Sequence, residues 1–327
     1  MYLVTGGAGM IGSNIAAELA AAGHAVVVCD WLRQDERWRN LAKHEIADII
    51  MPEDLFRWLA QNGNAVAGII HMGAISATTE TDVDSITHNN IRLTLDLWAW
   101  CTDHGVPLIY ASSAATYGDG HAGFDDMFSP DALARFRPLN AYGWSKHFID
   151  RRIARIVAQG QPTPPQWVGL KFFNVYGPNE YHKGSMKSVV AHNAARVAAG
   201  EPLRLFRSYR ADYTDGGQLR DFIYVKDCAR VVTWLLEHPG VSGLFNLGTG
   251  QARSWLDLGR SLFAALDLPE AIEFIEMPEQ LRGKYQYYTK AEMERLRAAG
   301  YAEPFTSLED GVSDYVRGYL RQDDPYR

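Results

Sequence analysis

The sequence is poor in cysteine and lacks any cysteine spacing that would hold zinc or build a disulfide framework. Only three cysteines occur in 327 residues, at Cys29, Cys101 and Cys228, and no two of them form a C-x-x-C pair. An odd number of widely separated cysteines is typical of reduced thiols in an intracellular protein. We therefore expect free, partly buried thiols and no metal site.

The chain also lacks an excess of basic residues and any long apolar run. Lys and Arg number 32 against 39 Asp and Glu, a net charge of -7, so no basic face predicts binding to nucleic acid. No run approaches the roughly 18 apolar residues of a membrane helix, and no export signal follows Met1. These absences predict a cytoplasmic protein without a membrane partner. The length allows one large domain or two modest ones.

Glycine is plentiful at the start of the chain, inside a strand, turn, helix, strand order. We predict a strand over residues 2–5, a helix over 13–22 and a strand over 25–29 that ends at Asp30. The turn between them, residues 6–12, fits both G-x-G-x-x-G and G-x-x-G-x-x-G. Such glycines let a pyrophosphate lie against a helix N-terminus, and the acid accepts from ribose hydroxyls. The pattern favours a dinucleotide site rather than a glycine-rich turn that binds no ligand.

Buried strands continue to alternate with helices along the chain. We predict strands over residues 66–71, 107–111, 168–174 and 243–248, and helices over 86–104, 140–156, 188–199 and 227–237. This alternation indicates an α/β fold with a doubly wound, Rossmann-type parallel sheet. We expect a dinucleotide-binding domain of residues 1–177 plus about 220–250, and a smaller, discontinuous α/β substrate-binding domain of 178–219 plus about 251–327.

Tyr142 and Lys146 stand four residues apart in the predicted helix over residues 140–156. Four residues is about one helical turn, so the phenol and the ammonium project from the same face. A phenol has a pKa of about 10, and a fixed positive neighbour would lower it toward neutral pH. The pair predicts a tyrosine that takes a proton from an alcohol. Because the same spacing also occurs on solvated helix faces, this prediction depends on the dinucleotide site.

Taken together, these residues resemble the extended short-chain dehydrogenase/reductase family. The matching positions run in the family's order through residues 5–12, Asp30, Gly73, Ala74, Asn89, Ser113, Tyr142, Lys146, Asn174 and residues 220–222. Segments 110–118, 173–186, 245–250 and 285–289 narrow the resemblance to nucleotide-sugar epimerases that invert C6'' of an ADP-heptose. The run from His182 to Met186 is the most specific of them.

The resemblance implies a cytoplasmic enzyme of lipopolysaccharide core synthesis that acts on an ADP-heptose with a bound NADP, or NAD, regenerated in each turnover. It implies that Tyr142 deprotonates the C6'' hydroxyl while Ser113 donates a hydrogen bond to the developing carbonyl. Lys146 would hold the ribose hydroxyls and lower the pKa of Tyr142. Lys183 stands at the position of a second acid/base, although a lysine there would also suit simple substrate binding. The family also suggests that the protein is a homo-oligomer and, more specifically, a homopentamer.

The resemblance also assigns binding residues. Those expected to contact the cofactor are Gly6, Gly9, Met10, Ile11, Gly12, Asp30, Trp31, Arg37, Met72, Gly73, Ala74, Ser76, Asn89, Tyr142, Lys146 and Val175. Those expected to contact the substrate are Ser113, Asn174, Lys183, Ser185, His192, Ser208, Arg220 and Tyr285. Arg220 suits a diphosphate because its planar fork binds two oxygens. His192, alone on a helix, would equally suit an interdomain contact.

Two departures from the family's pattern leave choices open. The polar loop over residues 209–219 is longer than expected. This length leaves open which of Arg207, Arg210 and Arg220 binds the diphosphate. Asp30 favours NAD because a carboxylate repels a 2'-phosphate, whereas Arg33 and Arg37 would bind one. A lysine that the family offers to that phosphate aligns with Pro52. The prediction of NADP rather than NAD therefore depends on the resemblance alone.

Three other functions share parts of this pattern. A nucleotide-sugar 4-epimerase would keep every cofactor residue but needs only one acid/base residue. The presence of Lys183 as a second one therefore argues against a 4-epimerase. A sugar 4,6-dehydratase would need an Asp-Glu pair where Ala114 and Ala115 stand. A dinucleotide-sensing binding protein would have no use for Tyr142, Lys146 and Ser113 together.

Overall fold

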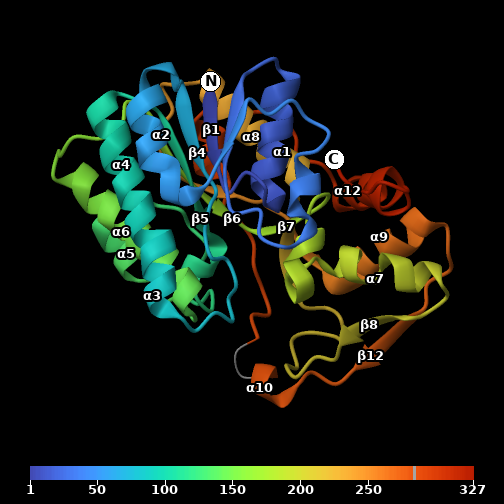
Figure 1. Cartoon of the computed structure of the whole chain (residues 1–327). Coiled ribbons are helices and arrows are strands. Elements are labelled where there is room, and N and C mark those ends of the chain that lie inside the picture. The colour runs from blue at the N-terminus through green and yellow to red at the C-terminus, as the bar shows by residue number, and fades with distance from the viewer. Residues whose placement is uncertain (283–284) are drawn as a thin grey trace.

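The computed structural model describes residues 1–282 and 285–327, and its largest element is a seven-stranded parallel sheet (Figure 1). In spatial order the strands are β10 (Gly243–Leu247), β6 (Trp167–Phe172), β5 (Leu108–Ser113), β4 (Gly68–His71), β1 (Tyr2–Thr5), β2 (Val26–Cys29) and β3 (Asp48–Ile50). The strand order reverses between β1 and β4, where the carboxyl ends of both strands leave a crevice for ligands. The predicted Rossmann-type fold is confirmed.

Helices cover both faces of this sheet because its strands are apolar on both sides. Along β1, Val4 packs with α1 (Met10–Ala21) and α8 (Val225–Glu237). Its neighbour Leu3 points the other way, toward α2 (Leu55–Asn62), α4 (Leu93–His104) and α6 (Ala141–Ala158). The shorter helices α3 (Val83–Ile86) and α5 (Pro130–Ala134) flank α6. The three cysteines are buried and free, as predicted.

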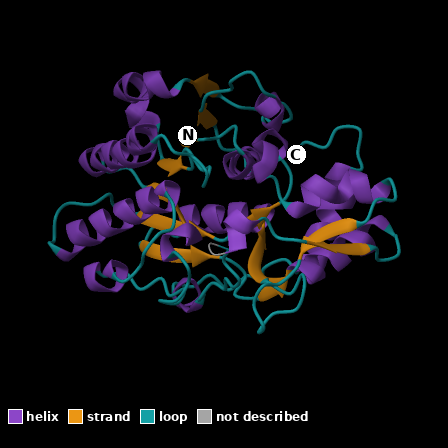
Figure 2. Ribbon diagram, turned by 90° about the horizontal axis from the view of Figure 1, so that it is seen from below, coloured by secondary structure: helices purple, strands orange, loops and turns teal. Residues whose placement is uncertain are grey.

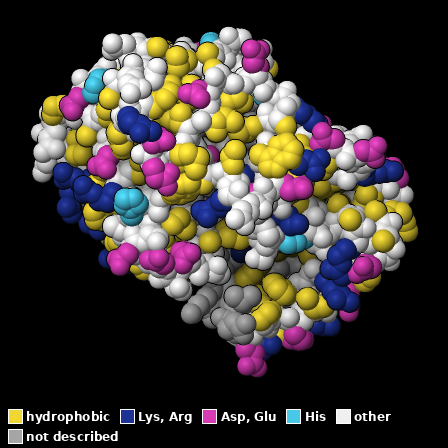
Figure 3. Space-filling view, viewed as in Figure 1, with side chains coloured by type: hydrophobic (Ala, Val, Ile, Leu, Met, Phe, Trp, Pro, Cys, Tyr) yellow, Lys and Arg dark blue, Asp and Glu magenta, His cyan; other side chains and the backbone are white. Residues whose placement is uncertain are grey.

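A second lobe with its own apolar core lies at one end of the sheet (Figures 1 and 2). It consists of α7 (Val189–Ala198), α9 (Trp255–Leu266), α12 (Leu308–Tyr315) and the paired strands β8 (Leu203–Phe206) and β12 (Ile272–Ile275), with α10 (Glu279–Arg282) beyond them. A small sheet of β11 (Ala252–Ser254), β9 (Leu219–Tyr224) and β7 (Asn174–Tyr176) joins the two parts, and α11 (Glu294–Ala298) packs near β10. Figure 3 shows basic side chains around the hollow between them.

Three differences from the sequence prediction concern the strands and the helix that ends at His104. The strand predicted over residues 168–174 is two strands, because β7 leaves the main sheet and pairs with β9. The helix predicted over 86–104 contains a π-helical segment, Thr87–Arg92, between α3 and α4. The edge strand β3 was not predicted, because only Ile50 of its three residues is buried. No helix within the two described ranges is long and apolar enough to span a bilayer.

Candidate active site

The glycine turn between β1 and α1 has no room for side chains. Gly6 has a φ of +65°, and a Cβ there would lie 2.5 Å from the nitrogen of Gly73. A Cβ on Gly12 would overlap the carbonyl oxygen of Gly6. Gly9 caps α1 with its backbone only, which leaves the first N–H groups of the helix to other acceptors. Because these groups and the helix dipole attract anions, the turn fits the pyrophosphate of a dinucleotide.

Asp30 follows β2 and lies under the same turn. Its Oδ2 accepts a hydrogen bond of 3.0 Å from the backbone N–H of Ala8. Burial raises the pKa of this carboxyl, while the Ala8 N–H and the charge of Arg37 lower it. Asp30 therefore fixes the glycine turn against the neighbouring strand, at the edge where a bound ribose would lie.

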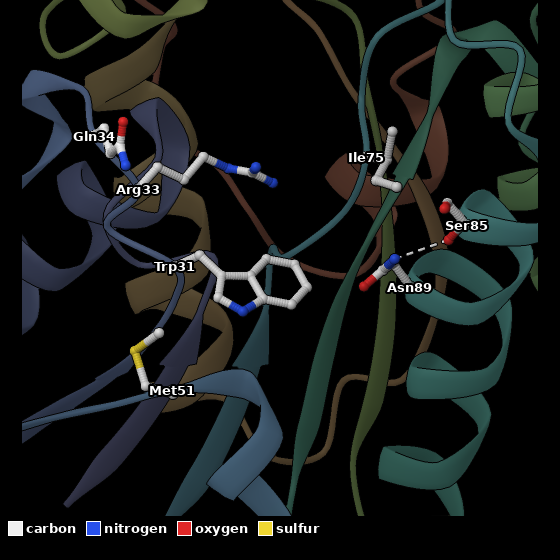
Figure 4. A pocket seen from close by; sticks show the side chains of 7 residues that line it. All are labelled: Trp31, Arg33, Gln34, Met51, Ile75, Ser85 and Asn89. Atoms are coloured by element: carbon white, nitrogen blue, oxygen red, sulfur yellow. Dashed lines mark hydrogen bonds between the residues drawn. The ribbon is translucent and has the colours of Figure 1, made fainter.

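A cavity of about 610 Å³ opens beyond Asp30, at the carboxyl ends of β2, β3 and β4 (Figure 4). Trp31 and Arg33 reach into it from one side, toward Ile75 and Asn89 on the other. Its walls are formed by Trp31, Arg33, Gln34, Met51, Ile75, Ser85 and Asn89. Trp31 and Asn89 were predicted to contact the cofactor. Gln34, Met51, Ile75 and Ser85 belong to no motif, so no signal in the sequence pointed to them.

Arg37, another predicted cofactor contact, is held by an acid. Its Nε and Nη2 donate to the two carboxylate oxygens of Asp35 at 2.8 and 2.7 Å. This bidentate pair raises the pKa of the guanidinium. A phosphate would have to compete with Asp35 for Arg37.

The turn after β4 carries Met72, Gly73, Ala74 and Ser76, all predicted to contact the cofactor, and Asn90 fixes this turn. The Asn90 side chain accepts from the Ile75 N–H at 2.9 Å and donates to the Ile75 carbonyl at 3.0 Å. It also donates to the hydroxyl of Ser145 at 3.0 Å. Asn90 therefore ties the cofactor side of the crevice to α6. The sequence analysis singled out only its neighbour Asn89, whose side chain donates to the Ser85 carbonyl.

A directed chain of hydrogen bonds runs behind this turn. The Thr94 hydroxyl donates to the Asn90 carbonyl at 2.6 Å, so its oxygen accepts from Nε2–H of His71 at 2.9 Å. Nδ1 of His71 must then accept from the Thr5 hydroxyl at 2.6 Å. Burial lowers the pKa of His71 to about 3, which keeps the ring neutral. His71 is therefore a fixed structural link between β1, β4 and α4.

Ser113 and Tyr142 come together where β5 ends and α6 begins. Asn140 caps α6 by accepting from the Gly143 N–H at 2.8 Å, and a Cβ on Gly143 would lie 2.7 Å from the Ala115 carbonyl oxygen. This close approach brings the Ser113 hydroxyl near the Tyr142 phenol. Burial raises the pKa of Tyr142, and the Ser113 hydroxyl lowers it.

Lys146 lies one turn further along α6 and is almost completely buried. Burial lowers its pKa to about 8, against the opposing effect of the Asp150 carboxylate. In the chain by itself, Ser113 is the group that lowers the pKa of Tyr142, since burial and Asp150 both raise it. The expected contribution of Lys146 to that pKa stays a prediction.

A fully buried ion pair connects the elements that carry Ser113 and Tyr142. Lys171, in β6, donates to Asp150 of α6 at 2.7 Å and to the Thr116 hydroxyl at 2.6 Å. Thr116 in turn donates to the Ser113 carbonyl at 2.8 Å, and Ser112 donates to Asp150 at 2.7 Å. The pair therefore connects the Ser113 turn to the helix that carries Tyr142 and Lys146. Ser112 and Thr116 lie in the family segment 110–118, whereas neither member of the ion pair was singled out from the sequence.

Replacing Lys171 by methionine should destabilise the protein by about 3–5 kcal/mol, because it leaves the charge of Asp150 buried and unpaired. Chemical unfolding followed by circular dichroism would measure this change. The double variant Lys171→Met, Asp150→Leu should recover most of the loss, since an apolar pair of similar volume removes the buried charge. Equal stability of the single variant and the wild type would show that the pair does not hold the two elements together.

Lys183 reaches the glycine turn from a distant part of the sequence. It lies in the 3₁₀ segment η6 (Tyr181–Met186), and its Nζ lies 3.6 Å from Sδ of Met10 in the first turn of α1. Burial lowers the pKa of Lys183, and the nearby carboxylate of Glu180 raises it. Glu180 is itself fully buried and accepts from the Ser188 hydroxyl at 2.6 Å. The structure thus places Lys183 beside the predicted cofactor turn.

Arg220 and Tyr285 meet in the second lobe. Arg220 is 7% exposed, and its guanidinium lies 5.2 Å from the ring centre of Tyr285 and 5.9 Å from that of Trp255. Burial lowers the pKa of this guanidinium. A buried cation between aromatic rings is well suited to bind an anion such as a diphosphate. The competing Arg210 is exposed and paired with Asp212, and Arg207 pairs with Asp215.

The other predicted substrate contacts are more dispersed. Asn174 starts β7 and accepts from the Thr289 hydroxyl at 3.5 Å. His192 is exposed, with its Nε2 3.2 Å from the Ser185 carbonyl, so these two residues lie together. The Ser208 hydroxyl donates to the Arg210 carbonyl within the long loop.

Asp221 is a buried residue whose importance the sequence analysis did not resolve. Its carboxylate accepts from the N–H groups of Thr249, Gly250 and Ala291 at 2.7, 2.9 and 3.0 Å. It thereby fixes the strand that carries Arg220 to segments 28 to 70 residues away. The sequence marked Asp221 only as the middle residue of a motif.

The comparisons with known proteins agree with this geometry. A family model described as the NAD dependent epimerase/dehydratase family matches residues 2–248. Over 330 residues the chain is 49% identical to the ADP-L-glycero-D-manno-heptose-6-epimerase of Nitratidesulfovibrio vulgaris strain DP4, with 100% of both chains covered.

Solved structures give the same picture. The ADP-L-glycero-D-manno-heptose-6-epimerase of Helicobacter pylori is similar with a TM-score of 0.77 and 28% identity, covering 97% of this chain and 95% of that one. A Thermus thermophilus UDP-glucose 4-epimerase in complex with NAD is similar with a TM-score of 0.72 and 25% identity, covering 97% of each chain.

Proposed function

Because the chain belongs to the NAD-dependent epimerase/dehydratase family, we propose that it inverts C6'' of ADP-D-glycero-β-D-manno-heptose to give the L-glycero epimer. The motif resemblance to this family is confirmed. The observation that carries the substrate is the 49% identity to an ADP-L-glycero-D-manno-heptose-6-epimerase over the full length of both chains. The protein is therefore an isomerase of nucleotide-sugar metabolism, and lipopolysaccharide core synthesis is the process that consumes its product.

The site fits a nicotinamide dinucleotide, which supplies a hydride acceptor that becomes the donor within the same turnover. The tight Gly6–Gly73 approach and the uncapped N–H groups of α1 support binding of its pyrophosphate. Asp30 lies where it would accept from the adenosine ribose, and Lys146 where it would hold the other ribose. Trp31, Asn89 and their neighbours would enclose the adenine end.

In the first half of the reaction, Tyr142 takes the proton from the C6'' hydroxyl. The hydroxyl of Ser113, which lies near the phenol, donates to the oxygen as it becomes a carbonyl. The positive Lys146 favours the phenolate by its charge. Oxidation at C6'' therefore needs three side chains that the β5 turn and α6 hold together.

In the second half, inversion would require the ketone to present its opposite face to the hydride that a bound dinucleotide would supply. C6'' lies outside the pyranose ring, so rotation of that end of the sugar is sufficient. After rotation the oxygen points away from Tyr142 and needs another proton donor. Lys183 is our candidate, because its Nζ lies at the predicted cofactor turn and burial lowers its pKa.

For the substrate, we propose that Arg220 binds the diphosphate while Tyr285 packs beside it. Arg220 suits this role better than Arg207 or Arg210, since both of the latter are paired with carboxylates. Asn174, Ser185, His192 and Ser208 are the remaining proposed contacts. The long loop over residues 209–219 would then close the far end of the site.

Lys183 and the residues after Ser113 argue against the related reactions. A 4-epimerase turns the whole ring and has no need of a second acid/base. A 4,6-dehydratase needs acids where this chain has Ala114 and Ala115. A dinucleotide sensor would have no use for Ser113, Tyr142 and Lys146 together.

We propose NADP as the physiological cofactor and Arg33 as the residue that binds its 2'-phosphate. Arg33 extends into the cavity beyond Asp30, whereas Arg37 is already held by Asp35 (Figure 4). Arg33→Ala should weaken NADP binding about tenfold, the loss of one or two charge-assisted hydrogen bonds, and should leave NAD binding unchanged.

Titration calorimetry with each dinucleotide measures this difference, with Arg57→Ala as a control that removes an exposed cation elsewhere. Equal weakening of NAD and NADP by Arg33→Ala would contradict a 2'-phosphate contact. Tighter binding of NAD than NADP by the wild type would contradict the choice of NADP itself.

Product analysis tests the proposed function. Purified protein incubated with ADP-D-glycero-β-D-manno-heptose should form the L-glycero epimer without net consumption of dinucleotide. Absence of that product, or stoichiometric reduction of added cofactor, would contradict an epimerase acting on this sugar. We further propose a cytoplasmic homo-oligomer, for which sedimentation of the purified protein is the direct measurement.

A further inference from the structure

The last residues of the chain pack tightly against the lobe that carries the glycine turn. Tyr326 is 5% exposed, its ring lies edge-on to Tyr181 at 5.1 Å, and the Arg39 guanidinium lies 4.4 Å from its centre. Lys43 donates to the Tyr326 carbonyl at 2.6 Å and pairs with Asp324 at 3.2 Å. Figure 1 marks this end of the chain beside α1. We call residues 324–327 the clamp segment.

Arg327 connects the clamp segment to α1 and to the segment before Lys183. Its guanidinium donates to the Asn14 side-chain oxygen at 3.0 Å and pairs with Glu18. Its backbone N–H donates to the side chain of Asn179 at 2.9 Å. A single residue thus bridges the cofactor helix and the segment 178–183.

The segment 178–183 is held on all sides by such contacts. Asn179 is fully buried with a φ of +72°, and its side chain donates to the Ser13 hydroxyl at 3.0 Å. Asn40 donates to the carbonyls of Ala8 at 2.7 Å and Asn179 at 3.2 Å. The Tyr181 hydroxyl donates to the Pro325 carbonyl at 2.7 Å. Because a non-glycine residue in the left-handed region is costly, these partners are needed to keep Asn179 in place.

We propose that the clamp segment positions Lys183 for the second proton transfer by fixing residues 178–183 against the cofactor helix. The inference deepens the proposed function and depends on it, because it assigns the clamp a role through Lys183. The clamp residues act through the loop and touch neither the substrate nor the reacting atoms. Asn14 and Asn40 bind the loop directly, and the clamp binds it through Asn179 and Tyr181.

Two graded variants of the full protein test the proposal. Arg327→Ala removes the bridge to Asn14 and Glu18, and deletion of residues 324–327 removes the whole clamp segment. Arg321→Ala is the matched control, because it deletes an exposed arginine from the same stretch. We expect deletion to lower kcat about tenfold, since displacement of a catalytic group by about 1 Å is enough to cause such a loss. KM should change less than kcat, because the proposed diphosphate contacts Arg220 and Tyr285 lie outside the loosened segment.

Hydrogen exchange gives a readout that does not depend on the reaction. Amides of residues 178–186 should exchange faster in both variants, while those of α6 keep their protection. Tyr181→Phe, which deletes one hydroxyl and keeps the ring, should show the same effect more weakly. Unchanged exchange at 178–186 after deletion would overturn the clamp, and faster exchange with kcat equal to that of Arg321→Ala would overturn its catalytic role.

The proposed epimerase function and the positioning role of the clamp segment are contradicted by different results. If the wild type forms no L-glycero epimer, the proposed function fails, while the exchange data still decide whether the clamp holds the loop. If the wild type is active and deletion changes only the thermal midpoint, the segment is structural and the positioning role is wrong.

Discussion

Tyr142→Phe is expected to lower epimerisation about a thousandfold while the protein keeps its fold and its dinucleotide. The change removes a single hydroxyl and keeps the ring between Ser113 and the rest of α6. Because that hydroxyl is the only proposed acceptor of the C6'' proton, no other group in the β5–α6 arrangement would replace it. Initial rates of L-glycero product formation, with bound dinucleotide determined after denaturation, give both quantities.

Tyr110→Phe is the matched control for this experiment. Tyr110 is a buried tyrosine in β5, and its hydroxyl makes only a long contact of 3.4 Å with Asp150. Its loss should change the rate by no more than about twofold, as expected for a weak supporting contact. If Tyr142→Phe retained more than about a tenth of the wild-type rate, the acid/base role of Tyr142 would be excluded.

The sequence predicted the parts of the site that local pattern determines. The glycines, Asp30 and the Tyr142–Lys146 spacing each carry their signal within one or two elements, because helix and strand geometry fix short-range neighbours. The observed hydrogen bond from Ala8 to Asp30 and the close approach of Gly6 to Gly73 follow from that order. The sheet was predicted for the same reason, since strands buried on both faces are apolar along their whole length.

The supporting contacts were not predicted, because their partners lie far apart in the sequence. Asn90 joins residues 15 and 55 positions away, and Lys171 joins Asp150 from another strand. A buried polar residue looks like a surface one until its hydrogen-bond partners are known. The π-helical segment before α4 also escaped prediction, since it preserves the apolar spacing of an ordinary helix.

Lys183 shares features of both groups, the residues predicted from local pattern and those fixed by long-range contacts. A motif identified it, yet its place beside Met10 is set by tertiary contacts of residues 178–183 with α1 and with Asn40. The local sequence pattern therefore identifies Lys183 as a candidate, whereas long-range packing determines whether its side chain can reach the reacting atoms. The clamp segment belongs to the second kind, which is why no sequence signal indicated it.

Lys183→Ala should reduce epimerisation by about 10²- to 10³-fold and leave dinucleotide content unchanged. The first proton transfer depends on Tyr142 and does not require Lys183, so oxidation at C6'' should persist in the variant. With no donor on the far side, the ketone should return only to the starting epimer. We therefore expect a transient change in nicotinamide absorbance on mixing with substrate, without accumulation of the L-glycero product.

Lys183→Arg separates proton transfer from simple binding. Arginine keeps the positive charge but does not release its proton near neutral pH, because its pKa exceeds about 12. If Lys183 only holds a substrate oxygen, arginine should restore much of the rate lost in the alanine variant. If Lys183 donates the proton, arginine should be as slow as alanine, because a guanidinium holds its proton too tightly to release it near neutral pH, whereas burial lowers the pKa of the lysine. Recovery of activity in Lys183→Arg would therefore assign the second proton to a group other than Lys183.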